Sequence, residues 1–269
     1  MTTATKATAR RPRAYLRVQG PDAVDYLNRM LSNDVPAVGS VDALLLTPKA
    51  RVIAPLLVWR RGEDDVLLLT EPELGEVVRA QLTKMRFAAK CEIEPEEHTS
   101  TVIFNAGVLG GGEGIQNRDY GQPAVEVLDA GLEATLGDEE LERLRIEAVT
   151  PRYGRELDDR VLPAEAGLEE RAISFSKGCY PGQEPVARQH FRGKVNRRLR
   201  VLDVDGDTPE PETPVVHDGK DVGRITSAVP GLALAYVRVA VPEDALLDVG
   251  GRAARLKGDA ATLLVPPRP

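Results

Sequence analysis

The N-terminal part of the chain alternates short strand-like runs with two amphipathic helices, and this order constrains the fold more than any other feature. The helices are expected to open at Pro21 and Pro72, because proline is favoured at the first helical positions. The strand-like runs are residues 13–19, 43–46, 52–59 and 66–70. Such an order of strand, helix, several strands and helix predicts an α+β fold with an antiparallel sheet.

A second unit of similar kind is expected further along. Residues 101–104 and 124–128 form strand-like runs, and Asp138 caps a predicted helix. The glycine-rich run 110–114 between them predicts a loop, because no Gly-Lys-Ser/Thr follows to bind phosphate. The segment 150–198 lacks long periodic elements and is expected to line a cavity.

The pattern changes to short strands and turns from about Leu199. Asp218-Gly219 lies between apolar runs, which is a strong hairpin signal. We therefore predict a small C-terminal β-barrel-like domain over residues 199–265. The rest divides into a disordered tail over 1–13 and an α+β domain over 14–198, with subunits of about 14–95 and 96–198.

Composition excludes several classes of protein. The 269 residues contain no long apolar run, so no membrane-spanning helix is expected. The net charge of −7 predicts poor non-specific binding of nucleic acid. The basic cluster at 188–200 could still hold a local anion. Cys91 and Cys179 alone form neither a disulfide framework nor a four-thiolate cluster site, so a reducing cytoplasm is expected. The three histidines show no metal-ligand spacing, and no metal is expected.

One segment carries most of the chemistry. It reads Lys177-Gly178-Cys179-Tyr180-Pro181-Gly182-Gln183-Glu184, with Arg188 shortly after. A neighbouring cation favours the reactive thiolate, and glycines allow tight turns and close approach of a ligand. The alternative is that Cys179 is simply a small buried apolar residue.

This segment resembles the signature of the YgfZ-type folate-binding proteins, relatives of the glycine-cleavage T-protein, an aminomethyltransferase. The resemblance extends, in order and spacing, over residues 16–23, 31–35, 46–52, 145–148, 151–154 and 162–168. Ala50 and Val149 stand where glycine is usual. The resemblance implies a T-protein-like fold of antiparallel sheets with helices, followed by a small barrel.

The resemblance also implies a site for tetrahydrofolate or a folate derivative. Glu147 matches the carboxylate that accepts the paired N–H groups of a pterin, although an unassigned glutamate is more often a solvated helix residue. Arg188 is a candidate partner for the acidic folate tail. Tyr153 and Tyr180 could pack on the ring or in the core. Cys179 and Lys177 are the candidate catalytic residues, with Gln183 and Glu184 as further polar groups.

The T-protein carries an aspartate pair that is needed for transfer, and here Ala54 and Pro55 occupy those positions. Neither side chain can take part in proton transfer. Three hypotheses stay open. The protein is a folate-dependent accessory factor for iron–sulfur enzymes, with a possible link to tRNA modification; a folate-dependent transferase with another substrate; or a folate-sensing module in which Cys179 is structural.

Overall fold

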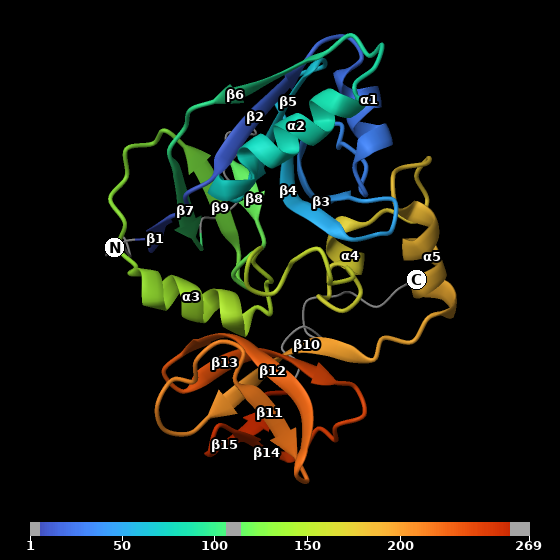
Figure 1. Cartoon of the computed structure of the whole chain (residues 1–269). Helices are drawn as coiled ribbons and strands as arrows, with labels where there is room; N and C mark the ends of the chain where they lie inside the picture. The colour runs from blue at the N-terminus through green and yellow to red at the C-terminus, as the bar shows by residue number, and fades with distance from the viewer. Residues whose placement is uncertain (1–5, 106–113, 259–269) are drawn as a thin grey trace.

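A computed structural model describes residues 6–105 and 114–258, which form two α+β units above a closed β-barrel (Figure 1). Residues 110–113 of the predicted glycine-rich loop and the ends of the chain lie outside the described residues. The predicted α+β fold with antiparallel sheets and a C-terminal barrel is confirmed. None of the helices in the described ranges is long and apolar enough to cross a membrane.

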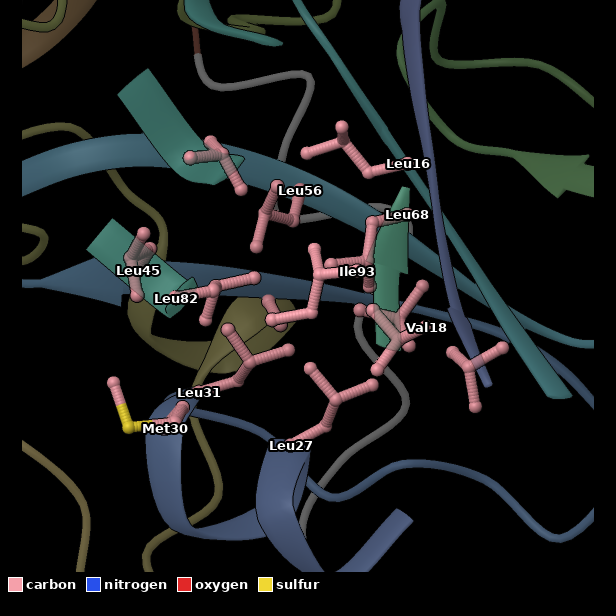
Figure 2. Packing of buried hydrophobic residues seen from close by; sticks show 14 of the residues in the cluster. Leu16, Val18, Leu27, Met30, Leu31, Leu45, Leu56, Leu68, Leu82 and Ile93 are labelled. Carbon is pink, nitrogen blue, oxygen red and sulfur yellow. The ribbon is translucent and has the colours of Figure 1, made fainter. Parts of the chain in front are cut away.

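The first unit is a five-stranded antiparallel sheet in the order β3-β4-β5-β2-β6. Its strands are β2 (Ala14–Gln19), β3 (Gly39–Leu46), β4 (Val52–Arg60), β5 (Asp65–Thr70) and β6 (Glu92–Glu96). Helices α1 (Ala23–Met30) and α2 (Gly75–Met85, after the short helix Pro72–Leu74) cover one face. Leu27 and Leu82 meet Leu16 and Leu68 in the core between them (Figure 2).

The second unit is a four-stranded sheet in the order β1-β7-β9-β8. Its elements are β1 (Thr8–Arg10), β7 (Ser100–Phe104), β8 (Ile115–Asn117), β9 (Ala124–Leu128) and helix α3 (Asp138–Glu147). The N-cap of α3 is Gly137, one residue before the predicted Asp138, and its N–H donates to Glu140 at 2.9 Å.

The expected disordered tail over 1–13 needs correction. Thr8 to Arg10 pair antiparallel with β7, and Thr8 Oγ1 donates to the Glu133 carbonyl at 2.6 Å. Arg11 and Arg13 that follow are held by buried carboxylates. Composition concealed this order, because the partners of these arginines lie far along the chain.

Six strands close the barrel. They are β10 (Arg197–Val204), β11 (Pro214–His217), β12 (Lys220–Val229), β13 (Leu232–Arg238), β14 (Leu246–Val249) and β15 (Arg252–Leu256). The predicted hairpin is present: Asp218 and Gly219 take φ values of +49° and +71° and join β11 to β12. Positive φ at both central residues matches the right-handed twist of the flanking strands.

Helices α4 (Glu169–Ala172) and α5 (Gln183–Arg192) complete the fold. Sequence patterning missed α5, since Pro185 lies inside it and Val186 is its one buried residue. Pro185 is the third residue of the helix, where the backbone N–H has no partner within a helix, so the ring is tolerated. The helix lies on the outside of the molecule (Figure 1).

Candidate functional site

A cavity of about 60 Å³ lies where the two α+β units and the segment between α3 and α4 meet. The hairpin β3–β4 supplies Leu44, Pro55 and Leu57, which form an apolar wall. The other side is strongly polar. Its charged residues are Arg11, Arg13, Asp42, Glu71, Arg118, Asp119, Arg145, Arg152 and Arg171. An apolar wall facing arginines suits a ligand with a ring and an acidic end.

Arg13 is fixed at the floor of the cavity. Its Nε lies 2.7 Å from Glu126 Oε1, and its Nη2 lies 3.3 Å from Asp119 Oδ2. Glu126 is fully buried and also accepts hydrogen bonds from Ser100 Oγ and from Asn117 Nδ2. Burial alone would raise the pKa of Glu126, but Arg13 and these donors outweigh burial and lower it. The carboxylate therefore stays ionised.

A second arginine joins the two units across the cavity. Arg171 on α4 places Nε 2.9 Å from Asp42 Oδ2 and pairs through Nη2 with Asp119. Burial would raise the pKa of Asp119, but Arg171 and Arg13 lower it. Breaking a buried pair on one side leaves an uncompensated charge, so these contacts hold the cavity in one geometry.

The barrel is tied to the cavity through Glu156. Arg145 Nη1 and the backbone N–H of Arg152 donate to its Oε2 at 3.0 and 2.9 Å. Ser227 Oγ of the barrel donates to its Oε1 at 2.6 Å, and Tyr236 Oη donates to its carbonyl oxygen at 2.9 Å. Helix α3, the segment that follows it and the barrel therefore meet at one charged network.

A larger groove of about 720 Å³ adjoins the cavity and shares Arg11, Glu71 and Arg152 with it. The barrel residues Ser227–Val229 form part of its wall. Arg152 Nη2 pairs with Glu142 at 2.9 Å, and its side chain is 35% exposed. Ligand pockets commonly measure about 300–1,000 Å³, so the groove has the size of a ligand site and the cavity is an inner recess.

The Cys179 loop is a separate place, outside the cavity. Cys179 is exposed, whereas Cys91 is buried and burial raises its thiol pKa. Lys177 turns towards the loop after α1, where its Nζ lies 3.0 Å from the Leu31 carbonyl oxygen and 2.6 Å from that of Asn33. Half-burial lowers the pKa of Lys177 to about 8.

Gly182 holds this loop against the β3–β4 turn. Its φ is +85°, and an added Cβ would lie 2.6 Å from the Thr47 carbonyl oxygen. Gly178 has no such neighbour within 4 Å. The same hairpin thus supports the Cys179 loop at its turn and lines the cavity along its strands.

None of the candidate catalytic and folate-binding residues named from the sequence lines the cavity. Glu147 Oε1 lies 3.6 Å from Lys257 Nζ of the barrel, and its side chain is 42% exposed. Tyr153 and Tyr180 pack into the hydrophobic core, and burial raises the pKa of Tyr180 to about 12. Gln183 Nε2 donates to the Lys177 carbonyl at 3.4 Å. Glu184 and Arg188 are exposed on α5.

Ala54 and Pro55 differ in orientation. Ala54 is fully buried in the core beneath α1 and α2, and Pro55 faces the cavity. The cavity therefore has a proline ring where the T-protein motif predicts a carboxylate. Among the residues that the structure describes, no three histidine, cysteine or acidic side chains come together as a metal-binding group.

Comparison with known proteins accounts for this architecture. Residues 196–262 match the CAF17 C-terminal β-barrel domain family. The chain is 27% identical to an aminomethyltransferase of Moorella thermoacetica, over 79% of this chain and 71% of that protein. It is also 27% identical to an uncharacterized protein of Haemophilus influenzae, over 85% and 86% of the two chains.

A solved structure shows the same fold. The glycine cleavage system aminomethyltransferase T from Bartonella henselae superposes with a TM-score of 0.80, covering 96% of this chain and 86% of that one, at 19% identity. The chain therefore has the fold of that aminomethyltransferase, and its C-terminal part is similar to the CAF17 β-barrel domain. The predicted T-protein-like fold with a C-terminal barrel agrees with these comparisons, whereas the buried ion pairs of the cavity could not be predicted from the sequence. Arg13 and Glu126 lie 113 residues apart, and no local pattern links them.

Proposed function

We propose that this protein binds a reduced folate in the cavity and groove and uses Cys179 to support the assembly or repair of iron–sulfur enzymes. The observation that supports folate binding is the set of residues that line the cavity and the groove together. A wall of Leu44, Pro55 and Leu57 faces Arg11 and Arg152 at the mouth. A pterin would pack on the wall, and its acidic tail would pair with the arginines.

The chemistry of the lining fits such a ligand, and the volume limits where it lies. The inner recess of about 60 Å³ holds only part of a folate, so the rest must occupy the groove of about 720 Å³. Arg152 separates the two spaces and is the most exposed of the described paired arginines at the mouth, at 35% against 13% for Arg11. Its guanidinium is therefore the group that a ligand would displace from Glu142.

Titration of the full chain with tetrahydrofolate tests the site. The native protein should bind, and Arg152→Gln should weaken binding by about 1–2 kcal/mol, because a charge-assisted hydrogen bond is lost. Glu147→Gln tests the assignment made from the motif, which predicts a loss of about 1 kcal/mol or more. A loss with Glu147→Gln alone would put the ligand at the α3–barrel junction, and no binding by the native chain would remove the folate site altogether.

Cys179 supplies the second half of the proposal. It is exposed, whereas the thiol of Cys91 is buried with a raised pKa, so iodoacetamide near neutral pH should label Cys179 first. Cys179 lines neither the cavity nor the groove, so bound folate should leave the labelling rate unchanged. Earlier labelling of Cys91 would contradict the assignment.

Complementation of a deletion strain tests the biological role. The native gene should restore the activity of iron–sulfur enzymes, Cys179→Ser should not, and Cys91→Ala is the matched control. Full rescue by Cys179→Ser would make the thiol structural and favour a folate-sensing module.

The same reasoning predicts no glycine-cleavage activity. Pro55 in the cavity and Ala54 in the core can neither donate nor accept a proton. An assay reconstituted with the lipoyl carrier protein should give background rates. Turnover equal to that of an aminomethyltransferase would overturn this part of the proposal.

A further inference from the structure

The C-terminal end of α5 and the segment after it form a basic region on an acidic protein. Residues 185–202 contain no aspartate or glutamate, although the whole chain has a net charge of −7. Two of the cations in this stretch are used within the fold. Arg197 Nε lies 3.0 Å from Glu165 Oε1, and Arg200 pairs with Glu243.

The remaining four cations are exposed: Arg188, Arg192, Lys194 and Arg198. Within residues 6–105 and 114–258, none of them has an ion-pair partner. We call these four residues together with Phe191 the α5 patch. Arg188, Phe191 and Arg192 share one face of the helix, because residues three and four apart are neighbours on its surface.

Phe191 gives the patch an apolar centre. It is 70% exposed, which is unusual for a large aromatic side chain. Its ring packs edge-on against His190 at 4.8 Å between centroids, and His190 stacks on Phe175 at 4.0 Å. His190 Nδ1 in turn lies 3.4 Å from Glu169 Oε1. The exposed ring is therefore held by a packed stack, and a partner would bind it at little cost in side-chain entropy.

We propose that the α5 patch docks an acidic segment of a partner protein, with an apolar side chain of that segment seated on Phe191. Charge complementarity identifies the partner, since Arg188 and Arg192 share the helix face of Phe191, and Lys194 and Arg198 follow it closely in the chain. Aromatic residues and arginine are the residues that most often dominate binding energy at interfaces. A long polyanion would be repelled by the acidic remainder of the chain, whereas a short segment meets the patch alone.

The α5 patch lies close to Cys179 in the chain. Cys179 lies four residues before α5, and a helix of ten residues is about 15 Å long. A segment bound on the patch would bring the rest of the partner to the exposed thiol. This inference goes beyond the proposed function, and it holds whether or not the cavity binds folate.

Fluorescence anisotropy on the full chain tests the docking with a defined probe, a short labelled peptide of alternating glutamate and leucine. The triple variant Arg188→Glu/Arg192→Glu/Lys194→Glu should weaken binding by at least roughly tenfold. The matched control is Lys84→Glu/Lys220→Glu/Arg255→Glu, which makes the same charge change at exposed positions elsewhere and should leave affinity nearly unchanged. Phe191→Ala should weaken binding equally at low and high salt, because the lost contact is apolar.

Three results would overturn the proposal. The first is equal weakening of peptide binding in the two triple variants, which would mean that the overall charge of the protein, and not the α5 patch, attracts the peptide. The second is no binding of the peptide by the native chain. The third is binding of a labelled oligouridine in preference to the peptide, with loss in the Arg188→Glu triple, since the patch would then be a nucleic-acid site.

Discussion

Lys177 Nζ lies 2.6 Å from the carbonyl oxygen of Asn33, and this contact joins two segments that are 144 residues apart in the sequence. The same ammonium reaches the Leu31 carbonyl at 3.0 Å. Ser174 N–H donates to the Ser32 carbonyl at 2.9 Å, so the segment 173–179 between α4 and Cys179 is hydrogen-bonded to the loop after α1. Lys177 therefore positions the Cys179 loop, and its charge is directed at backbone carbonyls.

Removing the two hydrogen bonds of the Lys177 ammonium should lower the stability of the folded protein. Lys177→Met leaves two carbonyl groups without their charged donor, and we expect a loss of about 1 kcal/mol because the ammonium is only half-buried. Lys49→Met is the control, since Lys49 is exposed on the neighbouring turn. Urea unfolding of the three proteins measures the difference. Equal stability of Lys177→Met and the native chain would show that the contacts with Leu31 and Asn33 contribute nothing.

The two glycines of the Cys179 loop should respond differently to a methyl group. Gly182→Ala strains a φ of +85° and drives a Cβ to 2.6 Å from the Thr47 carbonyl oxygen, so a loss of about 1–3 kcal/mol is expected. Gly178→Ala meets no atom within 4 Å and should change stability by less than about 0.5 kcal/mol. Thermal unfolding compares the pair, and equal effects would contradict the packing of Gly182 on the β3–β4 hairpin.

The sequence predicts those secondary-structure elements that depend on neighbouring residues alone. The Asp218-Gly219 turn, the strand-like runs and the helix carrying Leu141 and Leu144 follow from periodicity and turn chemistry. The antiparallel sheets and the barrel could be predicted for that reason. Helix α5 escaped prediction, because one buried residue provides no periodic signal.

The interior of the site could not be predicted in this way. Arg171 reaches Asp42 across 129 residues and Asp119 across 52, and each of these side chains is of a kind that usually lies on the surface. Only the tertiary fold brings them together. Glu147 illustrates the converse, because a motif match gave it a role that its position beside Lys257 of the barrel does not by itself explain.

Val149, at a position where the family resemblance predicts glycine, adopts a backbone conformation that favours glycine. It follows α3 with a φ of +54°, a conformation costly for a β-branched residue. Val149→Gly should relieve about 1–2 kcal/mol of strain and lose a smaller amount of packing, for a net gain of about 0.5–1 kcal/mol. Ala148→Gly, at a φ of −77°, should instead destabilise. Denaturant midpoints of the two variants should move in opposite directions, and a loss with Val149→Gly would mean that packing outweighs strain.

The pair Arg13–Glu126 is expected to be the most sensitive charged contact of the cavity floor. Glu126→Gln leaves the buried guanidinium of Arg13 without its main counter-charge and should cost about 3–5 kcal/mol. The double variant Arg13→Met/Glu126→Leu should cost less than the sum of Arg13→Met and Glu126→Leu measured singly, because it removes both charges together. Additive losses in this double-mutant cycle would show that the two side chains are not coupled.

His98 makes stability depend on pH. Its Nδ1 lies 2.7 Å from Asp129 Oδ2, and its Nε2 lies 3.0 Å from Glu96 Oε2. Burial works to lower the pKa of His98, but the hydrogen bonds to Asp129 and Glu96 outweigh it and raise the pKa above 6.5. The hydrogen bonds from Arg61 and His98 hold the pKa of Glu96 at about 2, so this carboxylate is charged throughout the neutral range.

The sign of the effect follows from linkage. A group whose pKa is raised by folding stabilises the folded protein fully at pH values below the pKa that the group has in the unfolded chain. That stabilisation is lost as the pH rises through the pKa of the group in the folded protein. His98→Gln should therefore lower stability most at about pH 6 and least at about pH 9. Urea unfolding at a series of pH values measures the difference from the native chain, with His217→Gln as a control on the barrel. A difference that stays constant with pH would show that His98 is neutral in the folded protein and that its contacts with Asp129 and Glu96 are ordinary hydrogen bonds.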